Sequence, residues 1–298
     1  MHEFTYESPR NLADAIACLS QHKGTAQPLA GGTDLIDQMR GGRSTPEVLV
    51  DTKKIEELRV LQVDEEGLRL GAAVPCYQIC SEAAIVRSYT ALSDSCQIIG
   101  GIQIQSRATV GGNLCNAGPA ADTTPSLIAL GAECLIAGVD GERTVPVESF
   151  CTGPGQNILA PGELLVELRF PAAMPRTGSH YRRMIPRNEM DIAVVGVGAA
   201  VALDDALECF TAVRVGLGAV APTPLLATVV GDQLVGQPVT DERIAAAAAA
   251  AQEIVAPITD MRGTKDYRVH VTGVLVKRVL HAAVSRARGE AVDCPPGN

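Results

Sequence analysis

Two glycine-containing segments carry the residue types that bind an extended anion. The first glycine loop, residues 28–35, reads Pro-Leu-Ala-Gly-Gly-Thr-Asp-Leu, and the second glycine loop, residues 109–122, reads Thr-Val-Gly-Gly-Asn-Leu-Cys-Asn-Ala-Gly-Pro-Ala-Ala-Asp. Because glycine lets backbone amides approach a ligand closely, successive amides of this kind form nests for anions. Two such loops predict a doubly held phosphate ligand, and a dinucleotide is the obvious candidate.

Each loop also has a purely structural interpretation. The first glycine loop could be a tight turn between a strand and a helix, with Thr33 or Asp34 as the helix cap. In the second, Asp122 could cap the next helix or accept a hydroxyl group of a nucleotide. Both interpretations stay open at the level of the residues alone.

The Rossmann fingerprint for dinucleotides fails in this chain. Residues 216–221 match GxGxxA, but Pro222 and Pro224 prevent the helix that must follow. The string at 196–198 runs on as an apolar strand. We therefore interpret both strings as places where glycine allows close packing, and a dinucleotide would have to bind by another route.

Composition narrows the classes of protein that this chain can be. Its 298 residues are 46% hydrophobic and 20% charged, which is typical of a globular protein with room for two domains. The net charge of −9 argues against a nucleic acid or an anionic membrane as partner. The first ten residues show no signal peptide, and the longest apolar run, residues 192–203, is too short to span a membrane. We expect a cytoplasmic protein.

The sequence gives little support for a metal site or for nucleophilic catalysis. The nine cysteines are scattered without the paired spacing of a zinc or iron–sulfur site, so we expect free, mostly buried thiols and no metal. The five histidines are isolated, which favours surface or core roles over a nucleophilic triad. The basic segment 180–187 is either a solvated strand edge or a cation placed beside an anionic or electron-accepting ring.

The pattern of apolar residues predicts a β-α-β lobe that is followed by antiparallel strands, and then a region of different character. A domain boundary is expected near residues 172–178, where prolines and a glycine interrupt the pattern. The predicted helices lie from Ser8-Pro9 to near Gly24, after the first glycine loop, and at 76–99, 126–130, 241–255 and 266–288; the predicted strands lie at 27–30, 48–50, 60–63, 68–70, 134–137, 144–146, 164–170, 192–203 and 211–220.

These motifs resemble the FAD-binding medium subunit of the molybdenum hydroxylases, the xanthine dehydrogenase and carbon monoxide dehydrogenase family. The two glycine loops resemble that family's two FAD pyrophosphate loops, and the resemblance extends over nearly the whole chain with its spacing kept. Three further segments carry it: Gly162-Glu163-Leu164-Leu165 before Phe170-Pro171, Asp191-Ile192-Ala193-Val194-Val195, and Pro257-Ile258-Thr259-Asp260-Met261-Arg262-Gly263 followed by Tyr267-Arg268.

The resemblance implies an α+β fold with a two-lobed FAD-binding domain of the vanillyl-alcohol oxidase (PCMH) type, followed by an α+β C-terminal domain of the CO dehydrogenase flavoprotein type. It places the FAD-binding domain at 1–175, with lobes of about 1–57 and 58–175. The C-terminal domain then occupies 176–290, and 291–298 form a tail.

The resemblance also implies which residues hold FAD. The pyrophosphate would lie against the two glycine loops, Ile99 would pack near the nucleotide, Asp122 would bond a hydroxyl group and Leu165 would touch the flavin. Arg183 stands where relatives often have a lysine near the isoalloxazine ring, and a guanidinium is not a neutral replacement there. The residues carried over to the pyrophosphate are Leu29, Ala30, Gly31, Gly32, Thr33, Asp34, Leu35, Thr109, Gly111, Gly112 and Asn113.

In this family the substrate is hydroxylated at a molybdopterin centre on a large subunit, and electrons reach FAD through two [2Fe–2S] clusters on a small subunit. The resemblance therefore implies an electron-transfer subunit without catalytic residues of its own, in a dimer of heterotrimers, which passes electrons to NAD⁺, a quinone or O₂. One type of relative has a cluster on an inserted loop of its flavin subunit, and the run 122–150 has no such insertion. Two alternatives remain: a self-contained flavoenzyme with Ser106 or Glu189 as proton donor, and a nucleotide-binding scaffold without activity.

Overall fold

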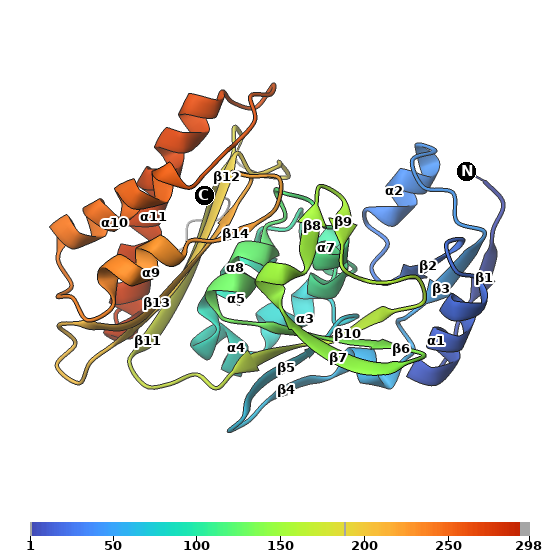
Figure 1. Cartoon of the computed structure of the whole chain (residues 1–298). Helices are drawn as coiled ribbons and strands as arrows, with labels where there is room; N and C mark the ends of the chain where they lie inside the picture. The colour runs from blue at the N-terminus through green and yellow to red at the C-terminus, as the bar shows by residue number, and fades with distance from the viewer. Residues whose placement is uncertain (1, 188, 293–298) are drawn as a thin grey trace.

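The N-terminal part of the chain is a small parallel sheet flanked by two helices. The computed structural model describes residues 2–187 and 189–292. The strand order β1-β3-β2 matches the predicted β-α-β lobe (Figure 1). The first helix begins later than predicted, because the side chain of Asn11, and not Ser8, accepts the hydrogen bond that caps it. These elements are β1 (Thr5–Glu7), α1 (Leu12–Gln21), β2 (Ala26–Leu29), α2 (Leu35–Arg40) and β3 (Val48–Asp51).

A five-stranded antiparallel sheet follows, in the order β4-β5-β10-β6-β7. Its middle strand, β10, is buried over most of its length and ends at the predicted interruption. The 3₁₀ helix η1 (Glu56–Arg59) leads into this sheet, and a second, η2 (Val147–Ser149), and a separate hairpin of β8 (Cys151–Gly153) and β9 (Gln156–Asn157) lie between its strands in sequence. Its strands are β4 (Leu61–Val63), β5 (Gly67–Gly71), β6 (Glu133–Gly138), β7 (Gly141–Pro146) and β10 (Leu164–Pro171).

Short helices cover this second sheet, and here one prediction was wrong. The single helix expected at 76–99 is three helices, because Glu82 and Tyr89 leave the helical conformation at the two junctions. The side chain of Glu82 accepts a hydrogen bond from the amide of Ala84 and so starts a new helix. The helices are α3 (Cys76–Ser81), α4 (Ala83–Ser88), α5 (Thr90–Gln97), α6 (Ile102–Gln105), α7 (Val110–Cys115) and α8 (Thr123–Ala129).

The C-terminal part is a four-stranded antiparallel sheet, β11-β12-β13-β14, between two groups of helices. Figure 1 shows α9, α10 and α11 on one side of this sheet and α5 and α8 on the other. The predicted strand at 192–203 begins only at Val195, and both predicted long helices are present with slightly different ends. The elements are β11 (Thr177–Met184), β12 (Val195–Leu203), β13 (Phe210–Gly218), β14 (Leu225–Leu226), α9 (Thr228–Leu234), α10 (Asp241–Glu253) and α11 (Lys265–Ala287).

The glycine strings of β12 and β13 serve close packing, as predicted. A Cβ atom on Gly198 would lie 2.6 Å from the carbonyl oxygen of Pro125, and one on Gly216 would lie 2.3 Å from it. These two glycines are register partners on the face of the sheet that meets α8, whereas Val197 and Val215 point into the core below α11. Glycine therefore lets helix α8 approach the third sheet at backbone distance.

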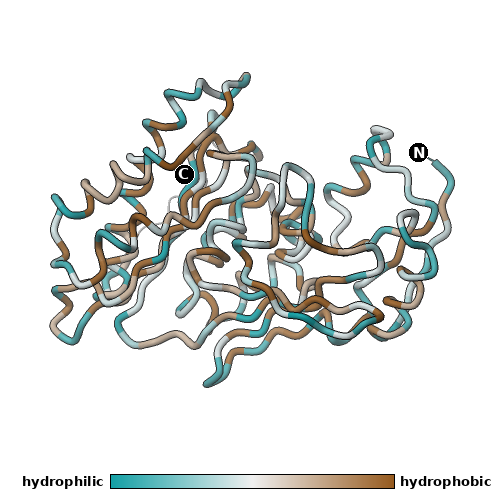
Figure 2. The backbone as a smooth tube through the Cα atoms, viewed as in Figure 1, coloured by the Kyte–Doolittle hydropathy of each residue, from teal (hydrophilic) through white to brown (hydrophobic). Residues whose placement is uncertain are grey.

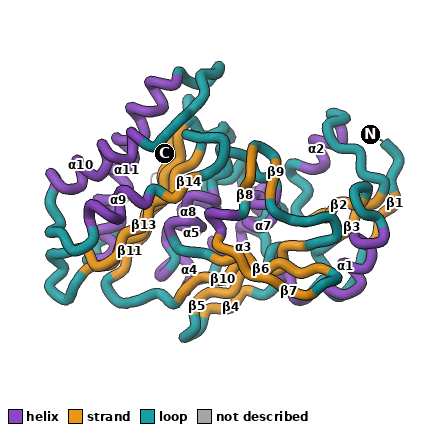
Figure 3. Tube along the Cα trace, in the orientation of Figure 1, coloured by secondary structure: helices purple, strands orange, loops and turns teal. Residues whose placement is uncertain are grey.

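Apolar side chains form three clusters. One lies between the N-terminal lobe and one face of the second sheet, one between the other face of that sheet and its helices, and one between the third sheet and α9, α10 and α11. The hydropathy colouring in Figure 2 shows brown segments along the sheet strands and the inner helix faces, and Figure 3 shows which of these segments are helix and strand. No helix among the described residues is both long and apolar enough to cross a membrane. Of the predicted tail at 291–298, residues 293–298 lie outside the described residues.

Candidate functional site

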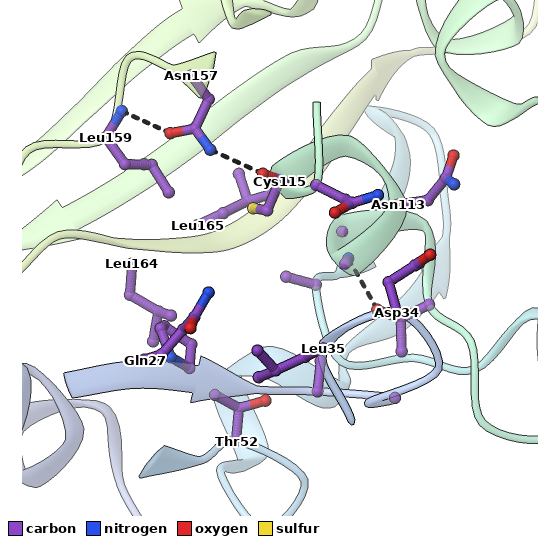
Figure 4. Close-up of a pocket in the computed structure, with 18 of the residues that line it drawn as sticks. Gln27, Asp34, Leu35, Thr52, Asn113, Cys115, Asn157, Leu159, Leu164 and Leu165 are labelled. Carbon is purple, nitrogen blue, oxygen red and sulfur yellow. Dashed lines mark hydrogen bonds between the residues drawn. The ribbon is translucent and has the colours of Figure 1, made fainter. Parts of the chain in front are cut away.

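A cavity of about 670 Å³ lies between the N-terminal lobe and the second sheet. The first glycine loop forms one wall, and α7 with the segment 157–165 forms the facing wall (Figure 4). The side chains drawn in Figure 4 converge from β2, α7 and β10, so the cavity joins parts of the chain that are far apart in sequence. This places the two glycine loops opposite each other, as a doubly held ligand requires.

The first glycine loop is shaped by its glycines. A Cβ on Gly31 would lie 2.2 Å from the carbonyl oxygen of Arg107, so only glycine allows the two loops to approach this closely. Gly32 has a φ of 75°, a conformation that favours glycine. Within the described part of the chain, the amides of residues 31–34 donate no hydrogen bond. They are donors beside a cavity, which is the arrangement of an anion nest.

The second glycine loop is partly helical, which differs from the expectation of an open loop. Its glycine pair lies in α7, whose first turn is capped by the Thr109 hydroxyl, an acceptor 2.9 Å from the amide of Gly112. A Cβ on Gly111 would lie 2.6 Å from the side chain of Ala72, so this helix packs tightly on the sheet. The helix start adds backbone amides and a partial positive charge to the cavity wall.

Polar side chains connect the two walls. The Nε2 atom of Gln38 in α2 donates to Oδ1 of Asn116 at 3.0 Å, and this bond links the helix that follows the first glycine loop to the second glycine loop. Asn157 donates through Nδ2 to the carbonyl oxygen of Cys115 at 2.8 Å and accepts from the amide of Leu159. Side chains that bond to the backbone thus fix the far wall.

Most of the predicted site residues line this cavity. Leu29 does not; it is the last residue of β2, and its carbonyl oxygen accepts hydrogen bonds from the amide and hydroxyl of Thr52. Asp122 and Arg183 do not line it either. The twelve that do are Ala30, Gly31, Gly32, Thr33, Asp34, Leu35, Ile99, Thr109, Gly111, Gly112, Asn113 and Leu165.

Asp122 and Arg183 lie together behind the cavity in a buried ion pair. The carboxylate of Asp122 accepts from Arg183 at 2.6 Å and from the Tyr181 hydroxyl at 2.8 Å, and it does not cap α8. Burial raises the pKa of Asp122 to about 6, although the charge of Arg183 opposes this shift. Arg183 is only 3% exposed, so the interpretation of this segment as a solvated strand edge is wrong for that residue.

Arg183 also holds the backbone of two segments, one in each domain. It donates to the carbonyl oxygens of Ile98 and Asp191, and its Nε atom has no hydrogen-bond partner among the described residues. Since Ile98 precedes the cavity residue Ile99, the guanidinium lies directly behind the wall at that point. One buried donor is therefore still free next to the predicted ring site.

Charged groups at the cavity are few and mostly paired. Burial and the nearby charge of Asp37 raise the pKa of Asp34, which faces the cavity. Arg43 is paired with Asp37 at 2.9 Å. Glu163 binds Arg143 at 2.7 Å, and this hydrogen bond holds the pKa of Glu163 below its usual value. The cavity thus offers an anion backbone amides more than side-chain cations.

Further lining residues were not among the predicted site residues. Some lie in the two glycine loops or in the segment Gly162-Glu163-Leu164, and most of the others are of types that carry no chemical signal. Gln27, Thr52 and Asn157 are ordinary polar residues, and Cys115 keeps its thiol protonated because burial raises its pKa to about 12. The eight cysteines that the structure describes are all free, as predicted, although only three of them are buried. The missed lining residues are Leu19, Gly24, Ala26, Gln27, Pro28, Gln38, Arg43, Thr52, Leu58, Ala72, Ala108, Cys115, Asn116, Gly155, Asn157, Leu159, Ala160, Pro161, Gly162, Glu163 and Leu164.

Known relatives agree with this geometry over almost the whole chain. The family model "FAD binding domain in molybdopterin dehydrogenase" matches residues 2–173, and "CO dehydrogenase flavoprotein C-terminal domain" matches residues 179–283. The carbon monoxide dehydrogenase medium chain of Hydrogenophaga pseudoflava is 32% identical, over 95% of this chain and 98% of the relative. The xanthine dehydrogenase FAD-binding subunit of Escherichia coli O157:H7 is 33% identical, over 96% and 98%.

Solved structures give the same result. The carbon monoxide dehydrogenase of Hydrogenophaga pseudoflava that lacks the Mo-pyranopterin moiety superposes with a TM-score of 0.91 at 32% identity, over 95% of this chain and 98% of the other. Quinoline 2-oxidoreductase from Pseudomonas putida 86 superposes with a TM-score of 0.87 at 27% identity, over 95% and 98%. The predicted α+β order of the two domains and the predicted cofactor, FAD, are confirmed, and free amides and bare glycines at the cavity suit its diphosphate. The chain therefore belongs to the FAD-binding medium subunits of the molybdopterin-dependent dehydrogenases, the family of the carbon monoxide and xanthine dehydrogenases.

Proposed function

We propose that this chain is the electron-transfer subunit of a molybdenum hydroxylase and passes electrons from the [2Fe–2S] clusters of a small subunit to NAD⁺, a quinone or O₂. Bound FAD supplies the redox chemistry, since a flavin exchanges both single electrons and electron pairs. The residues of this chain hold and orient the cofactor and exclude water from its diphosphate. A substrate would be oxidised at a molybdopterin centre on a large partner subunit.

One observation carries the proposal: the first glycine loop, with its free amides, and the start of α7 in the second glycine loop face each other across one cavity. Residues 30–34 and the start of α7 would hold the diphosphate, and Ile99 and Leu165 would pack against the nucleotide and the flavin. Leu165 is buried on β10 and Ile99 is half-buried, so both contribute apolar surface to the cavity wall. Arg183 would lie beside the flavin ring only if its free Nε or a rearranged guanidinium reached it.

The proposed assembly is a dimer of heterotrimers in the cytoplasm, each trimer with one large, one small and one copy of this chain. Support comes from the relatives, which are named as medium chains and FAD-binding subunits and match 95–96% of this chain. We place the division between the two domains in the segment 172–176, between the last strand of the second sheet and the first strand of the third.

The self-contained flavoenzyme remains the second candidate, but the structure gives it little support. Its two suggested proton donors, Ser106 and Glu189, are exposed and do not line the cavity. General acid catalysis requires the donor within hydrogen-bond reach of the reacting group. Neither side chain meets that condition in this structure.

Purification under native conditions tests the proposal. We expect one large and one small polypeptide to co-elute with this chain, together with molybdenum, iron and FAD. Anaerobic reduction of that complex, followed by mixing with NAD⁺, a quinone analogue or O₂ in separate experiments, would identify the acceptor. A chain that purifies alone, carries FAD and oxidises NADH at a steady rate would instead support the self-contained flavoenzyme.

A further inference from the structure

The end of strand β3 supports the first glycine loop from behind. The amide of Thr52 donates to the carbonyl oxygen of Leu29 at 3.1 Å. One residue further on, the Nζ atom of Lys53 donates to the carbonyl oxygen of Ala30 at 3.2 Å. Two consecutive carbonyl groups at the entry to the loop are therefore held by two consecutive residues of the neighbouring strand end.

The ammonium group of Lys53 is itself held in place. It forms an ion pair of 2.5 Å with the carboxylate of Asp51, whose side chain is only 3% exposed. That carboxylate also accepts from the Tyr6 hydroxyl of β1 at 2.5 Å and from the amide of Lys53 at 3.0 Å. Burial alone would raise the pKa of Asp51, but the hydrogen bonds from Lys53 and Tyr6 hold it below its usual value. Residues of β1 and β3, together with the Ala30 carbonyl of the first glycine loop, thus fix one lysine.

The position of Lys53 determines where an amide of the loop points. In a trans peptide the carbonyl group and the following amide point in opposite directions, and the structure contains no cis peptide among the described residues. When Lys53 fixes the Ala30 carbonyl on its own side, the Gly31 amide must point away from Lys53. Gly31 lines the cavity, and its amide donates no hydrogen bond to any described residue.

We propose that Lys53 is a positioning residue that aims the Gly31 amide at the FAD diphosphate and places a cation directly behind it. This inference rests on the proposed function of the cavity as the FAD site. Among the described residues that line the cavity, the basic side chain is that of Arg43, and it is already paired with Asp37. Lys53 therefore adds a cation behind the first glycine loop, although it does not itself line the cavity.

A pair of adjacent lysines provides the test. K53M removes the ammonium group and keeps an apolar stem, whereas K54M makes the same change of charge at an exposed neighbour. The full chain, with any subunits that co-purify, is stripped of FAD and titrated with FAD while flavin fluorescence is recorded. We expect K53M to bind FAD about tenfold more weakly, since one charge-assisted hydrogen bond is lost. K54M should bind like the wild type, and K53R, which retains a charged donor, should recover most of the affinity.

A second readout separates positioning from a general loss of structure. The ³¹P resonances of bound FAD should shift in K53M and stay unchanged in K54M, while circular dichroism of the FAD-free chains should be the same; K53Q replaces K53M if that variant does not fold. Wild-type affinity and unchanged ³¹P resonances in the Lys53 variants would overturn the inference and leave the FAD site intact. A wild-type chain that binds no FAD would contradict the proposed function and the inference together.

Discussion

The guanidinium of Arg183 lies 2.6 Å from the carboxylate of Asp122, and this buried pair joins the strand β11 to the end of the second glycine loop. Tyr181, two residues before Arg183 on the same strand, donates to the other carboxylate oxygen at 2.8 Å. A Cβ on Gly196 would lie 2.7 Å from the Tyr181 hydroxyl, so the bare glycine leaves room for this phenol. The segment that resembles a flavin-binding loop is thus fastened to the C-terminal domain by charge and hydrogen bonds.

The raised pKa of Asp122 predicts a specific dependence of stability on pH. A carboxyl group whose pKa is higher in the folded than in the unfolded chain stabilises the fold at low pH, and this contribution is lost as the pH rises through the folded value. For Asp122 that window runs from about pH 4, its unfolded value, to about 6. In D122N the group cannot titrate, so the free energy of unfolding of the wild type should fall relative to that of D122N across this window.

Urea unfolding of the two FAD-free chains between pH 4.5 and 7.5 measures this difference. The change should level off above pH 7, where Asp122 is ionised in both states. A difference between wild type and D122N that stays constant over the whole range would show that the pair with Arg183 keeps Asp122 ionised throughout.

A second buried pair, between Asp94 and Arg286, connects the FAD-binding domain to the C-terminal helix. Arg286 donates to both carboxylate oxygens of Asp94, at 2.6 and 3.0 Å, and His180 bonds the same carboxylate at 2.7 Å. Both side chains of the pair are less than 15% exposed. R286M leaves a buried carboxylate without its main partner, so we expect the free energy of unfolding to drop by about 3 kcal/mol. R278M, at an exposed position of the same helix, serves as the control.

For the pair of Asp94 and Arg286, we expect the free energy of unfolding to depend on pH in the opposite sense from that predicted for Asp122. Burial would raise the pKa of Asp94, but hydrogen bonds from His180 and Arg286 hold it below its usual value. Its stabilising contribution is therefore present above about pH 4 and lost as the pH falls through the lowered value. The advantage of the wild type over R286M, measured by thermal or urea unfolding, should disappear in strong acid. An advantage that persists at pH 2 would assign the effect of the mutation to packing.

A structural feature of this chain could be predicted from the sequence where it depends on residues that are close together in the sequence. The first glycine loop, the strands beside it and the packing role of Gly198 and Gly216 follow from residues that are neighbours in sequence or repeat with a strand period. The breaks in the segment 76–99 do not, because its residues have no strong helix breaker and the junctions are set by capping and packing. The pair of Asp122 and Arg183, 61 residues apart, has no local signature at all.

The glycines below α8 allow a direct test of how the domains meet. G216A would place a Cβ 2.3 Å from the Pro125 carbonyl oxygen, which neither backbone can avoid without moving the sheet away from α8. Overpacking of this kind costs about 1–3 kcal/mol. We expect that loss of stability in urea unfolding of G216A, whereas G118A, whose nearest neighbour would be a side-chain atom 3.9 Å away, should unfold like the wild type. Equal stabilities would mean that the sheet and α8 can separate freely.

The close approach of Gly31 to the residues that lead into the second glycine loop predicts the strongest effect on the cofactor. A Cβ on Gly31 would lie 2.2 Å from the carbonyl oxygen of Arg107, two residues before the second glycine loop begins, so G31A must push the first glycine loop away from this segment. The amides of both loops would then no longer reach one diphosphate, and FAD affinity should fall by about 10- to 100-fold. Fluorescence titration with FAD measures this, and thermal unfolding of the FAD-free chains checks folding. G41A is the control, because Gly41 lies outside both loops and does not line the cavity, and its Cβ would come no closer than 3.5 Å to another atom. If G31A retained FAD with wild-type affinity, one glycine loop would suffice to hold the cofactor, and the facing arrangement of the two would serve packing alone.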